Sequence, residues 1–384
     1  MKLIREEFAR MVKSPFIALA FLVFLAFNAF LIYQYVGDEE SRQALGQVHG
    51  TVLDYGVDLR ANGQDFTADG LQLDKFMEFY ESYIESYANL YENLDMMSIL
   101  ERKEGIADYH PTGAYGKFID NNYQKLQKRV EEIKNSGEGD YGFYPGIVYG
   151  IHGILYGKLG KKLLLEMAVL VILCILFLLD YERMHKTRDL VIATKTGKKI
   201  VKTKAVVGLV CGLIYSGLLM LGTYAYFFWN VSFAGLWEVP VASVIMAEER
   251  NQMMYPFVTF WRITEAQYFL LTVTVFFLAL LVVGGLTIAF WMILQNSYLA
   301  FLFQCMIYMA CLLFAYQCHT ATFFDVAEAV INPASLWITC GAWFMENAIS
   351  LSFVGNEFWC VGCSGAVMAA LVLIGRWRYR KLEL

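Results

Sequence analysis

Charged residues are scarce in this sequence of 384 residues. Asp, Glu, Lys and Arg together make up 17% of it, and hydrophobic residues make up 58%. A soluble globular protein carries about 25% charged residues. This composition excludes an ordinary soluble protein and predicts a polytopic membrane protein surrounded by a lipid bilayer.

The sequence also lacks the common motifs of catalysis and cofactor binding. The Gly-Lys pair Gly197-Lys198 has no glycine five residues before Gly197 and no Ser or Thr after Lys198, so it does not form a phosphate-binding loop. No two of the five histidines are spaced as a zinc pair, and no Gly-x-Ser-x-Gly elbow is present. We therefore expect no catalytic residue, metal or cofactor in this chain.

Six apolar runs are candidates for membrane spans, since roughly 20 apolar residues cross the hydrocarbon. They cover residues 15–36, 163–180 and 205–229, two parts of 266–324 separated at Gln295-Asn296-Ser297, and 358–375. The first run is too long for a secretory signal and lacks its small-residue cleavage pattern. We therefore expect it to be retained as a span.

The predicted spans have almost no ionisable side chains in their middle. Glu166 and Asp180 lie toward opposite ends of the second span, where we expect interfacial positions. Proton- and ion-driven transporters usually need carboxylates or histidines at mid-membrane depth. The energy for any transport is therefore expected to come from elsewhere.

The basic residues beside the spans gather on one side. They form three groups: Lys2, Arg5, Arg10 and Lys13; Arg183, Lys186, Arg188, Lys195, Lys198, Lys199, Lys202 and Lys204; and Arg376, Arg378, Arg380 and Lys381. Lys and Arg beside a span are kept on the cytoplasmic side, so we predict a plasma-membrane protein with both termini in the cytoplasm. The net charge of −5 then reflects acidic outer residues and indicates no nucleic-acid binding.

The predicted fold class is an all-α polytopic membrane protein with six transmembrane helices, an N-terminal amphipathic surface helix and a helical extracellular domain. Its segments are 1–14, a cytoplasmic amphipathic helix; 15–36, the first transmembrane helix; 37–162, the extracellular domain; 163–180, the second transmembrane helix; 181–204, a cytoplasmic loop; 205–376, transmembrane helices 3–6 with outer surface or re-entrant helices; and 377–384, a cytoplasmic tail.

The outer region is predicted to be helical, because apolar residues recur at helical spacing over 71–100 and 115–133. Many of these residues are tyrosines. We interpret them as the core of a small helical cap, since a tyrosine ring suits a half-wet interface, and a ligand-binding role is the alternative. Further short helices are expected over 236–246, 322–331 and 335–349.

The segment between the second and third spans resembles the first cytosolic loop of ABC transporter permeases of the six-span exporter type (the ABC-2 type permease family). In that family an acidic residue ends the second span, and a coupling helix, a Ser/Thr-x-Gly/Ser-basic turn and a basic residue follow. Here these places are held by Glu182, by residues 188–193, by Thr194-Lys195-Thr196-Gly197-Lys198 and by Lys204. The helix that ends in Lys13-Ser14-Pro15 resembles the membrane-surface helix of the family, with Glu6 at its acidic place.

The resemblance implies that a separate cytosolic ABC ATPase, which would hold ATP and Mg, contacts this loop. The implied coupling residues are Glu182, Arg183, Arg188, Asp189, Leu190, Ile192, Thr194, Lys195 and Gly197, and the implied surface-helix contacts are Glu6 and Arg10. The resemblance also implies a second permease subunit, either an identical copy or a related chain. The implied function is ATP-driven export of an amphiphilic cargo, such as a peptide, a drug or a lipid-like compound.

Other interpretations of the same residues remain open. The basic segment could serve only to fix the topology and to contact anionic lipid. The chain could be a membrane sensor or scaffold whose outer region binds a ligand, with no transport. A membrane enzyme would need a polar catalytic set at membrane depth, and the sequence offers none.

Overall fold

The structure is a computed structural model of the full chain. It describes residues 2–36, 91–92, 94–106, 112–140, 151–187, 197–231, 233, 235–243, 246, 248–250, 253–255, 257–317, 322–346 and 353–382.

The prediction of six helices long and apolar enough to cross a membrane is confirmed. In chain order they are α2 (Pro15–Val36), the continuous helix formed by the π-helical η2 (Gly153–Gly160) and α7 (Lys161–Leu179), α10 (Gly197–Asn230), α11 (Glu265–Leu294), α12 (Ser297–Gln317) and α15 (Asn356–Leu382). Their number, length and composition fit a multi-pass membrane protein.

Three helices extend beyond their predicted bounds. The second candidate span begins at Gly153, ten residues before the predicted start, so part of the predicted outer domain belongs to this helix. α10 and α15 likewise include residues assigned to the loop and to the C-terminal tail. Hydropathy marks only the part of a helix that is apolar, whereas backbone hydrogen bonds continue the helix into polar sequence.

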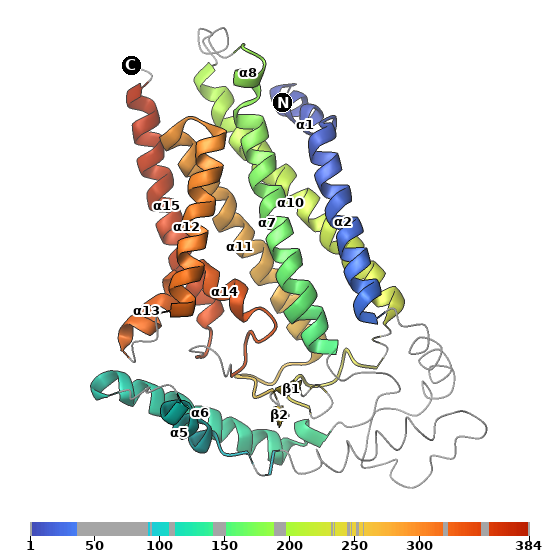
Figure 1. Ribbon diagram of the computed structural model, residues 1–384, viewed down its shortest axis with the longest axis vertical. Helices are drawn as coiled ribbons and strands as arrows, with labels where there is room; N and C mark the ends of the chain where they lie inside the picture. The colour runs from blue at the N-terminus through green and yellow to red at the C-terminus, as the bar shows by residue number, and fades with distance from the viewer. Residues whose placement is uncertain are drawn as a thin grey trace, which may run out of the picture.

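The bundle has two distinct ends (Figure 1). Both termini, α1 (Lys2–Val12) and α8 (Tyr181–Met184) lie at one end, which we call the terminal end. At the other end, the cap end, lie α5 (Met96–Ile106), α6 (Gly113–Ser136), α13 (Phe323–Ile331) and α14 (Pro333–Thr339), together with β1 (Glu248–Arg250) and β2 (Met253–Tyr255). The two strands form a single antiparallel pair.

The helix formed by η2 and α7 is the centre of the bundle. In its most apolar window 67% of the residues are buried, against 11% in α12 and 17% in α15. α7 packs against α10 and α11, and its side chains Leu163, Met167, Leu170 and Ile175 are fully buried in the main apolar cluster. α10, α11, α2 and α12 therefore pack around α7, whereas α15 packs on α11.

Two glycines of α10 allow its backbone to approach α7 closely. A Cβ atom added at Gly208 would lie 2.8 Å from Ile175 Cα, and one added at Gly212 would lie 2.8 Å from Val171 Cα. Both distances are well below van der Waals contact. The four-residue spacing places both glycines on the same face of α10, which is the usual arrangement of small residues between packed membrane helices.

A buried polar cluster joins η2 to α11 at the cap end. Tyr156 donates a hydrogen bond to Glu265 Oε1 at 2.7 Å, and His152 Nδ1 lies 3.7 Å from Glu265 Oε2. His152 Nε2 lies 3.2 Å from the carbonyl oxygen of Gly341, and this nitrogen must donate because a carbonyl only accepts. The segment before α15 is thereby linked to the central helix.

The cap packs on the end of the bundle through a second apolar cluster. Its tyrosines Tyr91, Tyr115 and Tyr123 are buried there with residues of α5 and α6, as the interpretation of a tyrosine core predicts; the other tyrosines of 71–90 lie outside the described residues. Arg129 donates to Glu138 at 3.1 and 2.5 Å and to the carbonyl oxygen of Thr259 at 3.1 Å. Both side chains of this ion pair are nearly fully buried.

Two local predictions need correction. The described part of 236–246 forms turns that pair with the start of α11 through Pro240 and Thr264, so the helix expected there is wrong. The helix expected over 335–349 is α14, which begins at Pro333 and ends at Thr339. Asn332 caps this helix and Pro333 occupies its first turn, a favoured position for proline.

The glycine contacts of α10 lead to a stability prediction. Gly208→Ala and Gly212→Ala should each lower the thermal unfolding temperature of the purified protein in detergent, because forcing atoms into a packed contact costs about 1–3 kcal/mol. Gly217→Ala is the matched control, since its added Cβ would lie at an ordinary 3.6 Å from Phe277. Alanine favours a helix over glycine by about 1 kcal/mol, so equal stabilisation of all three variants would contradict the close approach.

Candidate functional site

Among the described residues, those expected to contact an ATPase lie on α1, on α8 and at the start of α10. Glu182 and Arg183 lie in α8, Gly197 begins α10, and Arg10 lies in α1. The remaining candidates, Arg188, Asp189, Leu190, Ile192, Thr194 and Lys195, lie outside the described residues.

The ammonium group of Lys204 connects the two ends of the 188–196 loop. Its Nζ contacts Glu182 Oε2, donates to the carbonyl oxygen of Leu178 at 2.9 Å and lies 3.6 Å from Glu7 Oε2. Lys204 and Glu7 are each 1% exposed and Glu182 is 14% exposed. An ammonium group has three N–H donors, and here they face partners on three separate segments. We call Glu7, Arg10, Glu182 and Lys204 the terminal-end network.

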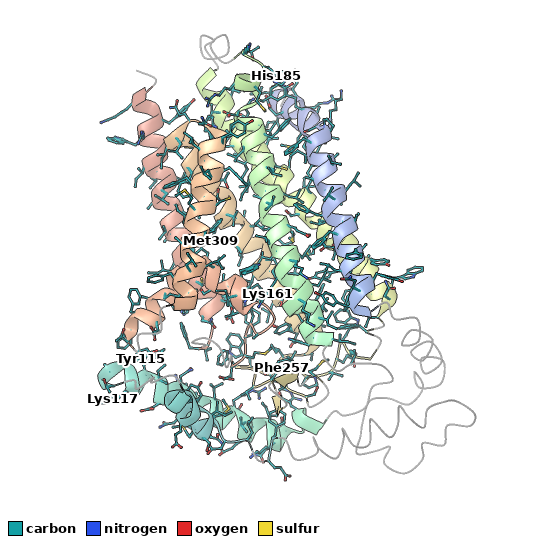
Figure 2. All side chains as sticks on the ribbon, in the orientation of Figure 1. Tyr115, Lys117, Lys161, His185, Phe257 and Met309 are labelled. Carbon is teal, nitrogen blue, oxygen red and sulfur yellow. The ribbon has the colours of Figure 1, made fainter. Side chains whose placement is uncertain are left out.

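Arg10 links α1 to the same network. Its guanidinium lies 2.7 Å from Glu7 and 3.5 Å from Glu182, and its Cζ lies 4.7 Å from the ring centre of Tyr181. Tyr181 stacks in turn on His185, with ring centres 4.2 Å apart (His185 is labelled in Figure 2). Since Arg10 is 37% exposed, solvent weakens these contacts, and they orient α1 more than they stabilise it.

The acidic residue of α1 in this network is Glu7, which sequence reasoning missed. Glu6, which the resemblance implies as a surface-helix contact, is exposed on α1, and its contact with an ATPase stays a prediction. Burial raises the pKa of Glu7 above its usual value, and the charges of Lys204 and Arg10 partly oppose this shift. No spacing rule singles out Glu7, because Glu6 and Glu7 lie four and three residues before Arg10 and both spacings place a carboxylate beside that arginine.

The start of the loop is also attached to the turn between α11 and α12. The carboxylate of Asp180 accepts from Trp291 Nε1 at 3.4 Å and from the backbone N–H of Ser297 at 3.2 Å. Arg183 donates to the carbonyl oxygen of Gln295 at 3.0 Å, and Gln295 has the positive φ of 51° that ends α11. Asp180 therefore lies at a helix end, as expected, but with a structural role.

Glu166 does not lie at the end of its span. It is buried well inside the candidate span Gly153–Leu179, where its Oε2 accepts from Asn28 Nδ2 at 2.6 Å. Asn28 Nδ2 also contacts Thr223 Oγ1 at 3.2 Å. The helix begins ten residues before the apolar run, so Glu166 lies further from its start than predicted, and the interfacial position stays a prediction.

The contacts at the terminal end hold α8 in place against several helices. α8 is fixed to α1 and α10 by the terminal-end network and to the α11–α12 turn by Asp180 and Arg183. The loop of 188–196 therefore lies between α8 and α10, which are joined to each other by Glu182 and Lys204. The same two helices are also joined to α1 and to the α11–α12 turn. Within the residues that the structure describes, no group of three or more His, Cys, Asp or Glu side chains is placed to hold a metal ion.

Removing the ammonium group of Lys204, which lies beside both Glu7 and Glu182, should strongly destabilise the terminal end. Lys204→Met leaves the carboxylates of Glu7 and Glu182 with the partly exposed Arg10 as the remaining cation of the network. The loss of one partner from a buried ion pair costs about 3–5 kcal/mol. Lys202→Met is the matched control, because Lys202 is exposed on the same helix. Thermal unfolding in detergent measures both variants.

A second substitution tests the cause. Adding Glu7→Gln to Lys204→Met removes the more buried of the two carboxylates that lost the ammonium group, and it should recover part of the lost stability, as coupled neighbours require. Additive losses from the two changes would contradict a shared network.

Comparison of the chain with protein-family models, with curated proteins and with solved structures found no match. No relative therefore identifies a family for this chain. Its function has to be inferred from the residues at the terminal end and from the arrangement of the six candidate spans.

Proposed function

We propose that this chain is the transmembrane permease subunit of an ATP-binding-cassette exporter, driven by ATP that a separate cytosolic subunit hydrolyses. The observation that carries the proposal is the attachment of both ends of the 188–196 loop to the same ammonium group. Glu182 lies just before the loop and Lys204 just after it, and their side chains are in contact. A force applied to such a loop reaches the helices instead of bending a flexible connection.

The helices that would receive this force are identified by their contacts. Lys204 and Glu182 belong to α10 and α8, Glu7 and Arg10 belong to α1, and Asp180 ends α7. The bonds of Asp180 and Arg183 extend the path to the α11–α12 turn. Packed helices move as rigid bodies, so displacement of the loop would shift α7 and α10 together.

The loop itself carries the side chains that would bind the ATPase. Arg188, Asp189, Leu190 and Ile192 combine charge with apolar anchors, as a helix bound in a groove requires. Thr194, Lys195 and Gly197 would form the turn that returns the chain to α10. ATP and Mg would be held by the partner and not by this chain.

The membrane orientation belongs to the same proposal. With the basic loop in the cytoplasm, both termini are cytoplasmic and the cap lies outside the plasma membrane. The side chains of Ile4, Phe8 and Val12 on α1 are exposed, at 53%, 42% and 53%. They would lie in the inner leaflet while the opposite face of α1 holds the terminal-end network.

A second permease subunit, an identical copy or a related chain, would complete the pathway. The weakly buried helices α12 and α15 leave apolar faces that such a subunit or lipid would cover. The cargo would be amphiphilic, because the spans are apolar and rich in aromatic side chains. The carboxylate of Glu166 is already bonded to Asn28, which supports a packing role and not a proton relay.

Co-purification tests the coupling. Cells that express the tagged chain should yield a stable complex with an ABC ATPase, and Arg188→Ala with Leu190→Ala should reduce its recovery at least about tenfold, the loss expected for interface anchors. Lys202→Ala is the control and should retain the complex. Failure to recover any ATPase with the intact chain would favour a sensor or scaffold.

Accessibility of inserted tags tests the orientation. An epitope inserted after Lys195 should be reached by antibody only in permeabilised cells, and one inserted after Gly137 should be reached in intact cells. The second tag serves as the positive control for surface exposure. A loop tag detected on intact cells would overturn the proposed topology and the coupling with it.

A further inference from the structure

A buried histidine and a buried glutamate face each other at the cap end without a hydrogen bond between them. His152 lies directly before η2 and Glu265 begins α11, and each side chain is 1% exposed. The Nδ1 atom of His152 lies 3.7 Å from Glu265 Oε2, and neither atom has a hydrogen-bond partner among the residues that the structure describes. Buried polar atoms without partners are costly, so this gap needs a physical explanation.

The other contacts of the two side chains decide which protons they carry. Nε2 of His152 lies 3.2 Å from the carbonyl oxygen of Gly341 and therefore donates to it. A neutral imidazole has only one N–H group, so its Nδ1 would then present a lone pair to Glu265. Because Glu265 Oε1 accepts from Tyr156 at 2.7 Å, Oε2 is the oxygen that meets this lone pair. Two acceptors face each other unless a proton lies between them.

One additional proton satisfies both atoms. If the proton is on Nδ1 of His152, the imidazolium pairs with the carboxylate of Glu265. If it is on Oε2, the neutral carboxyl group donates to the imidazole. Both arrangements have no net charge, so the proton belongs to the pair and not to one residue. Without it, the carboxylate would be a buried charge without a compensating partner, which is strongly unfavourable.

A basic side chain does not supply the missing positive charge. Among the described residues, no Lys or Arg side chain forms an ion pair with Glu265. Arg262, three residues earlier in the sequence, is 69% exposed, and its guanidinium lies 3.8 Å from Glu138. The ring of Phe257, which is labelled in Figure 2, packs on His152 with the ring centres 4.6 Å apart. The surroundings of the pair are therefore packed, and a proton is small enough to enter them.

Several other titratable groups surround the pair. They are Tyr156 of η2, Lys161 of α7, Tyr224 of α10, Tyr268 of α11, Cys340 after α14 and Glu357 of α15. Tyrosine ionises near pH 10, so the three tyrosines stay neutral below about pH 9. Burial raises the pKa of the Cys340 thiol to about 12, and Lys161 partly opposes this shift. Glu357 accepts from the backbone N–H of Phe344 at 2.7 Å, and its own titration has to be separated by experiment.

We propose that His152 and Glu265 bind one proton between them, and that this proton holds the segment around Gly341 against the central helix. The imidazole contacts Glu265 with one nitrogen and Gly341 with the other. Loss of the proton would turn the ring away from the carboxylate and break its bond to the carbonyl. The adjacent η2 is π-helical, a rare conformation that is frequent at functional sites. The proposal concerns the cap end alone, so it stands or falls independently of the permease function.

Amide hydrogen exchange of the purified full chain in detergent, measured as a function of pH, tests the site. The segment 339–346 is the reporter, because the N–H groups of Phe344 and Glu346 are hydrogen-bonded there. Opening of the site would expose His152, and a histidine in water releases its proton above about pH 6.5. The open state then holds one proton fewer than the closed state. Protection, corrected for the intrinsic exchange rate, should therefore fall by up to about tenfold per pH unit as the pH rises from about 7 to 9.

Glu265→Gln is the decisive variant. Its amide accepts from Tyr156 and donates to Nδ1 of His152 without an additional proton, so the segment should stay protected while its protection no longer depends on pH. His152→Gln, whose amide donates to Gly341, is the second variant and should also remove the pH dependence if Glu265→Gln does not fold. His185→Gln, at an exposed histidine of the terminal end, is the matched control and should retain the wild-type profile.

Glu357→Gln separates the pair from the other buried carboxyl group. The amide oxygen of this variant still accepts from the N–H of Phe344, and the pH dependence should persist. Protection of the wild-type segment that does not change with pH would overturn the proposal. A profile that is unchanged in Glu265→Gln, or one that disappears in Glu357→Gln, would overturn it as well.

Discussion

The buried ammonium group of Lys204 is the contact on which the terminal end of this protein depends. A charge with 1% exposure is costly unless its donors are paired. Its partners come from α1, from the end of α7 and from α8, so satisfying one charge fixes the position of three segments. The carbonyl of Leu178 would otherwise be one of the unpaired groups at the end of α7.

The central helix connects this network to the cap end. α7 is buried between α10 and α11. Tyr156 of its extension η2, and His152 directly before η2, contact Glu265 of α11. Between these ends, Glu166 binds Asn28 of α2. Polar contacts thus occur at both ends and inside the apolar bundle, and each joins α7 or its extension to a different helix. This arrangement suits a bundle whose helices shift as units.

Several elements could be predicted from the sequence because their cause is local. Apolar runs of span length reflect the membrane itself, and α6 follows from the helical spacing of Ile119, Leu126 and Val130. The terminal-end network was only partly foreseen. Helical periodicity places Glu6 and Glu7 on neighbouring faces of α1, and the position of Lys204 on another helix decides which carboxylate is buried. The hydrogen bond of Glu166 was not foreseen for the same reason, because its partner Asn28 lies 138 residues away in the sequence.

The sequence by itself determined six membrane-length helices, the basic loop between the second and third of them, and the absence of common catalytic motifs. These properties depend on composition and on spacing along one segment. Only the tertiary structure decided which charges are paired and where the helices end. Those outcomes depend on atoms from distant segments meeting within hydrogen-bond distance, and neither hydropathy nor periodicity contains that information.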